Sequence, residues 1–164
     1  MSNQPSESGT ALLTGEHEFL AFALGGEQYG IDIQTVQEIR KMDAVTTMAN
    51  APAHLKGVIN LRGIIVPIVD LRVWLGLPDA KFDLNTVVIV VSLRGHTVGL
   101  VVDGVSDVCT LSQEHIKAAP PLHGTMNTEY IVGIGAEGER MLILVDIEAL
   151  LSGQDMGMIG QLVA

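Results

Sequence analysis

The sequence has little of four things: cysteine, aromatic residues, basic residues and long apolar runs. Its one cysteine, Cys109, excludes an intramolecular disulfide and favours a reducing compartment. Aromatic residues make up 4% of a chain that is 48% hydrophobic, so the core has to be built from aliphatic side chains. A net charge of −10 argues against nucleic acid and anionic lipid surfaces as partners.

No apolar run approaches the ~20 residues that span a bilayer. Residues 1–16 lack a basic region followed by an apolar stretch, and are rich in Ser, Gly, Thr and Glu, which predicts a disordered leader. We therefore expect a soluble, cytoplasmic protein without direct membrane insertion. A chain of 164 residues forms one domain, or two small lobes that share a core.

Patterns that would indicate an enzyme are missing. The five histidines show no metal-binding spacing, and neither a P-loop nor G-x-S-x-G occurs. Gly133–Gly138 satisfies G-x-G-x-x-G, but the apolar residues 140–145 predict a strand where a dinucleotide site needs a helix. We predict a hairpin there, with a nucleotide-dependent enzyme as the weaker interpretation. The prediction is a non-enzyme without metal or cofactor, in which Cys109 is a small core residue.

The residues 57–72 form the most regular part of the sequence. Their valines and isoleucines predict two strands joined at Arg62 and Gly63. Asp70 and Asp146 each precede a short helical segment and are predicted to be N-caps rather than catalytic acids. The nearly unbroken apolar run 86–93 predicts a strand with both faces covered.

The chain repeats itself. A shift of 69 residues places 24–33 over 93–102 and 36–39 over 105–108, and a shift of 76 places 68–71 over 144–147. Each half contains five short strands, the content of a small barrel. We predict an all-β fold with short helices, made of two five-stranded barrels side by side. The first barrel would span 17–78 and the second 86–146, joined by a polar bridge at 79–85 and followed by a helix and tail at 147–164.

Two charges, Glu38 and Arg62, lie at the ends of apolar strands. They are predicted either to pair at a partly desolvated edge or to be two unrelated solvated charges. The repeat aligns Arg62 with Gly138, so no arginine matches it in the second half. This asymmetry suggests that the barrel does not need Arg62, and that the residue serves partner binding.

Six segments together resemble the CheW family of bacterial chemotaxis coupling proteins. They are EFLAFALG (18–25), YGIDI (29–33), VQEIR (36–40), GVINLRG (57–63), VPIVDLR (66–72) and VVDGVSDV (101–108). The resemblance covers about residues 17–152. It implies two SH3-like barrels in an adaptor that joins the cytoplasmic tips of chemoreceptors to the regulatory domain of the histidine kinase CheA. It also implies recruitment to receptor arrays at the membrane.

The resemblance assigns residues to the two partners. Those expected to bind the receptor are Ile33, Val36, Glu38, Ile39, Gly57, Val58, Arg62 and Val108; those expected to bind the kinase are Lys117 and Leu122. An apolar groove between the barrels would take the apolar side of a receptor helix, with the charges at its rim. The alternative function is a small-molecule-binding β-barrel, although the valine- and isoleucine-rich strands offer few inward polar groups.

Overall fold

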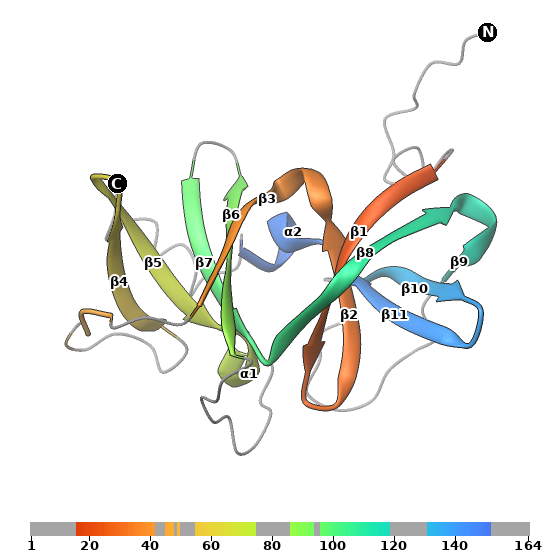
Figure 1. The fold of residues 1–164 in the computed structure, drawn as a ribbon, viewed down its shortest axis with the longest axis horizontal. Helices are drawn as coiled ribbons and strands as arrows, with labels where there is room; N and C mark the ends of the chain where they lie inside the picture. The colour runs from red at the N-terminus through yellow and green to blue at the C-terminus, as the bar shows by residue number, and fades with distance from the viewer. Residues whose placement is uncertain are drawn as a thin grey trace, which may run out of the picture.

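The computed structural model describes two β-sheets and two short α-helices (Figure 1). It describes residues 16–41, 45–47, 49, 55–74, 86–93, 96–118 and 131–151. The first helix is α1 (Leu71–Trp74) and the second is α2 (Ile147–Leu151). No helix in the described ranges is long and apolar enough to cross a membrane.

Sheet A contains six strands. Their order across the sheet is β8 (Gly104–Ser112), β1 (Glu16–Leu24), β2 (Glu27–Asp32), β11 (Arg140–Val145), β10 (Ile131–Glu137) and β9 (Ile116–Lys117). All neighbours are antiparallel except β2 and β11, which run parallel. A 3-10 helix, η3 (Gln113–His115), connects β8 to β9.

Sheet B contains five strands. Their order is β3 (Val36–Lys41), β6 (Val87–Leu93), β7 (His96–Val102), β5 (Ile64–Asp70) and β4 (Leu55–Leu61). The strands β5 and β7 run parallel and the other pairs are antiparallel. The expected fold class, all-β with short helices and two β units, is therefore confirmed.

The predicted division of the chain between the two units is wrong. Sheet A takes β1 and β2 from the first half of the chain and β8 to β11 from the second, so neither 17–78 nor 86–146 forms a sheet of its own. A second 3-10 helix, η2 (Ile33–Thr35), carries the chain from sheet A to sheet B, and Asp103 carries it back. The repeat identifies strands of similar sequence. Which strands share a sheet depends on these two connections, which the repeat does not reveal.

Among the described residues, buried apolar side chains form three clusters. Inside sheet A, Phe19 and Leu144 belong to one cluster, and inside sheet B, Val66 and Val90 belong to another. The third and largest lies between the sheets and includes Leu20, Phe22, Leu24, Ile89, Val91 and Leu100. Because successive side chains of a strand point to opposite faces, β1 and β6 each contribute to two clusters. The prediction that the strand near 86–93 is covered on both faces is confirmed.

The predicted turns and caps are largely confirmed. Gly138 has φ +64° and lies in the turn between β10 and β11, so the glycine-rich segment is a hairpin. Asp146 Oδ1 accepts from the backbone N–H of Ala149 at 3.2 Å, which caps α2. Asp70 Oδ1 accepts from the N–H of Arg72 at 3.0 Å at the start of α1. The last residue of the predicted leader 1–16, Glu16, is instead the first residue of β1. Residues 1–15 of this leader, the bridge 79–85 and the tail from residue 152 lie outside the described residues.

Candidate docking surface

The strand β3 forms one edge of sheet B and carries several of the expected receptor-binding residues. Val36 and, just before it, Ile33 are partly buried and pack against the cluster between the sheets. Ile39 points to solvent and is among the most exposed large apolar side chains described. An aliphatic side chain at such an edge, beside an apolar cluster, is suited to contact with a partner.

The predicted pairing of Glu38 with Arg62 is confirmed. Arg62 Nη2 donates to Glu38 Oε1, and Arg40 Nη1 donates to Glu38 Oε2 at 3.2 Å. The hydrogen bond from Arg62 is the main cause that holds the pKa of the Glu38 carboxyl below its ordinary value, so the group stays ionised. Since the guanidinium of Arg62 is mostly exposed, the pair adds little stability and leaves a cation at the surface.

Arg62 also has an unusual backbone. It is the one non-glycine residue with positive φ (53°) in the described part of the chain, and it is followed by Gly63 at φ 87° in the turn between β4 and β5. Two successive residues of positive φ are typical of a tight two-residue hairpin, where asparagine and glycine are preferred. Asn60 Oδ1 accepts from the N–H of Gly63 at 2.8 Å and supports the turn. An arginine that accepts this conformation is a candidate for a functional role.

Gly57 is one of the residues expected to bind the receptor, but it does not lie on the surface. It is buried on β4 with φ +151°, and a Cβ built on it would lie 2.2 Å from the backbone O of Thr46. The neighbouring Val58 exchanges two backbone hydrogen bonds of 2.9 Å with Thr46. Gly57 therefore allows the segment around Thr46 to close against β4, and its effect on any partner has to be indirect.

Val108 lies on β8, the edge strand of sheet A, and is nearly half exposed. The repeat aligns it with Ile39, and the structure places both side chains on edge strands that follow a crossing between the sheets. Figure 1 shows β3 and β8 running diagonally on either side of the boundary between the two sheets. The expected receptor-binding residues thus come from both sheets.

The inference that Arg62 has no counterpart is wrong. Arg140, the first residue of β11, donates to both carboxylate oxygens of Asp107 on β8, and Asp107 is the residue that the repeat aligns with Glu38. The hydrogen bond from Arg140 lowers the pKa of the Asp107 carboxyl, as Arg62 does for Glu38. The alignment missed this arginine because it lies two residues after Gly138, at the start of the strand instead of in the turn.

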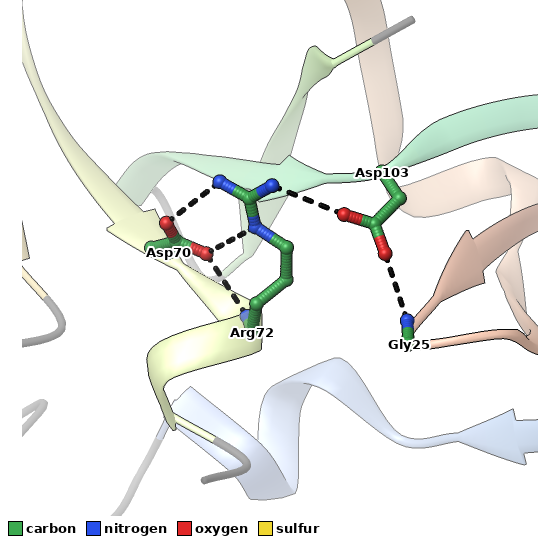
Figure 2. A network of polar contacts seen from close by, with 4 residues as sticks. All are labelled: Gly25, Asp70, Arg72 and Asp103. Carbon is green, nitrogen blue, oxygen red and sulfur yellow. Dashed lines mark hydrogen bonds and ion pairs between the residues drawn. The ribbon is translucent and has the colours of Figure 1, made fainter. Parts of the chain in front are cut away.

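A buried network that the sequence did not reveal joins the two sheets (Figure 2). Arg72 and Asp70 are both about 1% exposed, and Arg72 Nε and Nη2 donate to the two oxygens of Asp70 at 3.0 Å. Arg72 Nη1 donates to Asp103 at 3.0 Å, and Asp103 Oδ2 accepts from the N–H of Gly25 at 2.7 Å. Asp70 is thus an N-cap, as predicted, and also the counterion of a buried arginine.

The expected kinase-binding residues are only partly described. Lys117 lies exposed on β9, at the far edge of sheet A from β8 in the strand order. Leu122 lies outside the described residues. No group of three or more potential metal ligands lies together in the parts of the chain that the structure describes.

Cys109 is buried in the cluster inside sheet A, as predicted, and its Sγ donates to Glu137 Oε1 at 3.0 Å. Burial, followed by this hydrogen bond, raises the pKa of the thiol to about 11. Because the folded state holds the thiol proton more tightly than the unfolded state, the free energy of unfolding falls as the pH rises from the ordinary pKa of 9.0 towards about 11.

We expect Cys109 to react with a thiol reagent such as Ellman's reagent at least ~100-fold more slowly in the native protein than in denaturant at pH 8. The thiolate fraction alone falls by about that factor when the pKa rises by two units, and burial slows access further. Stopped-flow absorbance in buffer and in urea measures the two rates. Similar rates in both solvents would contradict the burial of this side chain.

Comparisons with known proteins place the chain among chemotaxis proteins. Residues 18–155 match the family model for the CheW-like domain. The chemotaxis protein CheW of Klebsiella aerogenes is 57% identical over 150 residues, which are 90% of each chain. CheW of Bacillus subtilis is 33% identical over 138 residues, 84% of this chain and 88% of that protein.

A solved structure gives the same result. The scaffolding protein TtCheW of Thermoanaerobacter tengcongensis is 30% identical and superposes with a TM-score of 0.78 over 85% of this chain and 94% of that one. The alternative of a small-molecule-binding β-barrel has no support from any of these relatives.

Proposed function

Because this chain belongs to the CheW family, and is thus a chemotaxis scaffold, we propose that it couples chemoreceptors to a histidine kinase. In this proposal the cytoplasmic tips of the receptors bind the edges of sheets A and B, and the regulatory domain of the kinase CheA binds elsewhere on the protein. The protein performs no chemistry. It contributes a coupling free energy between two bound partners, so that receptor conformation changes kinase activity.

The observation that carries the receptor contact is the pair of exposed aliphatic residues Ile39 and Val108, on edge strands of different sheets. Each follows the acid of an acid–arginine pair in its edge strand, Glu38–Arg62 on sheet B and Asp107–Arg140 on sheet A. Since successive side chains of a strand point to opposite faces, the apolar residue and the ion pair lie on the two sides of the same strand edge. Apolar contacts flanked by charges match the apolar stripe and polar borders of a receptor helix. Such contacts can be weak one at a time, because an array of many copies adds avidity.

For the kinase we propose a contact that includes Lys117 and Leu122. Lys117 is exposed on β9, beyond the 3-10 helix η3 that follows β8 and nine residues along the chain from Val108. A separate surface lets the protein hold receptor and kinase at the same time, which a coupling role requires. Recruitment to membrane-associated receptor arrays follows from this proposal.

Replacing Val108 by aspartate is expected to weaken binding to a receptor cytoplasmic fragment by about tenfold or more, because a charge would enter an apolar contact. The affinity is measured by isothermal titration calorimetry, and kinase activation is measured in a mixture of receptor-bearing membranes, CheA and this protein. CheA activation should fall in parallel with receptor binding.

The matched control is Val132→Asp. Val132 is 41% exposed on β10 and Val108 is 46% exposed on β8, so the same charge is placed at similar exposure outside the proposed surface. The control should bind the receptor fragment like the parent protein, and both variants should keep the parent melting temperature within a few degrees. Equal affinity of Val108→Asp and the parent protein would contradict the proposed surface.

A further inference from the structure

The two edges of the docking surface are alike in their apolar residues. The repeat aligns Val36 with Val105, and both are partly buried against the cluster between the sheets. It also aligns Ile39 with Val108, which are 45% and 46% exposed. The strands that the repeat relates also occur in equivalent order, β3-β6-β7-β5-β4 in sheet B and β8-β1-β2-β11-β10 in sheet A, so the apolar part of the surface has an approximate two-fold symmetry. By itself, such a surface would accept a helical partner in two opposite directions.

The ion pairs at the two edges are alike in their bonding and opposite in their exposure. In sheet B the side chain of Arg62 is 68% exposed and that of Glu38 is 26% exposed. In sheet A the side chain of Arg140 is 28% exposed and that of Asp107 is 53% exposed. Sheet B thus presents mainly a cation at the edge that carries Ile39, and sheet A presents mainly an anion at the edge that carries Val108.

Neighbouring charges strengthen this difference. On sheet B, Arg40 also pairs with Glu38, and Lys41 is exposed next to it at the end of β3. On sheet A, Glu137 is half exposed and lies 3.7 Å from Arg140, between the nearest charged atoms of the two side chains. The local excess of charge is therefore positive at the edge of sheet B and negative at the edge of sheet A.

We propose that Asp107 contacts the partner and, together with Arg62, fixes the direction in which a receptor helix docks. The partner is an amphipathic helical segment with an apolar stripe, an acidic side chain that reaches Arg62 and a basic side chain that reaches Asp107. The reversed direction would bring like charges together at both edges, which disfavours it without changing the apolar contacts. This inference rests on the proposed receptor contact and adds its orientation and the charge pattern of the partner.

The experiment exchanges the charges within each pair, so that each internal ion pair is kept while the exposed sign is inverted. The first variant carries Asp107→Arg and Arg140→Asp, the second carries Glu38→Arg and Arg62→Glu, and the third carries all four changes. Affinity for a receptor cytoplasmic fragment is measured by calorimetry as a function of salt. The direction of docking is measured by paramagnetic relaxation from a nitroxide on Val132→Cys, which is exposed, whereas Cys109 is buried.

The first and second variants are each expected to bind at least ~10-fold more weakly at low salt, because both edges then present the same sign. The third variant is expected to regain most of the affinity, with the nitroxide on this protein broadening the signals of the opposite end of the receptor fragment. Parent-like affinity of the first variant, or an unchanged direction in the third, would overturn the proposal.

Two further variants separate the possible failures. If a variant with an exchanged pair does not fold, Asp107→Asn tests the proposal in its place. We expect this variant to bind the receptor fragment at least ~3-fold more weakly and with a smaller dependence on salt. Parent-like binding would overturn the proposal. Val108→Asp tests the surface itself. If Val108→Asp weakens binding and the charge exchanges do not, only the orientation is refuted; if neither has an effect, the proposed receptor contact is refuted as well.

Discussion

Replacing Arg72 by methionine is expected to lower the free energy of unfolding by about 3–5 kcal/mol, the cost of leaving one member of a buried ion pair uncompensated. Asp70 is fully buried and would lose the two hydrogen bonds from the guanidinium. Asp103 would lose its contact with Arg72 as well, which loosens the connection between sheets A and B. Urea unfolding followed by circular dichroism measures the change.

The control is Arg40→Met, which removes an arginine from a partly exposed pair with Glu38 and should cost ~1 kcal/mol or less. A second comparison combines Arg72→Met with Asp70→Asn, which removes the buried charge and keeps an acceptor for the N–H at the start of α1. This double variant should regain part of the lost stability. A cost of under 1 kcal/mol for Arg72→Met would show that Asp70 finds water or another partner.

Replacing Gly57 by alanine is expected to cost about 3 kcal/mol or more, since overpacking and a strained φ each cost about 1–3 kcal/mol. The new Cβ would lie 2.2 Å from the backbone O of Thr46, and a backbone atom cannot move aside as the end of a side chain can. The two hydrogen bonds between Thr46 and Val58 would have to open. Urea unfolding again measures the effect.

Gly63→Ala is the matched control for Gly57→Ala. Gly63 has φ +87°, yet nothing lies within 4 Å of a Cβ built there, so this substitution isolates the cost of the backbone conformation at ~1–2 kcal/mol. If the two variants lost the same stability, the close approach to Thr46 would carry no cost. Since Gly57 is buried, weaker receptor binding by its variants should follow their loss of folded structure.

Local features were predictable from the sequence, whereas the assembly of the sheets was not. Valine- and isoleucine-rich runs and glycine-containing turns identified the strands, since both signals act over a few neighbouring residues. The pairing of β1 with β8 and of β2 with β11 depends on contacts across most of the chain, which leave no local pattern. The similarity of the two halves even favoured the wrong division, because each half looks like a complete unit.

The candidate site shows the same limit. Glu38, Ile39 and Val108 could be named from their place in the repeat and from the family resemblance. The role of Arg140 depends on a hairpin that reaches β8 from a distant part of the sequence, and the burial of Arg72 depends on the meeting of the two sheets. Gly57 belongs to a segment that resembles the family. Only the close approach of Thr46 to the place of its Cβ shows that this glycine supports the packing of β4 and does not contact a partner directly.

The two crossings between the sheets also determine when the protein can fold during its synthesis. Sheet B is complete once residue 102 has left the ribosome, because all its strands lie between 36 and 102. The β1–β2 hairpin is made before sheet B, yet its partner β8 follows only at 104–112, and its partner β11 only at 140–145. The outer edge of β1 stays unpaired until β8 is made and that of β2 until β11 is made, and unpaired strand edges are prone to aggregate. The first strands of the chain thus wait the longest for their partners, and they are the segment of the nascent chain that most needs protection.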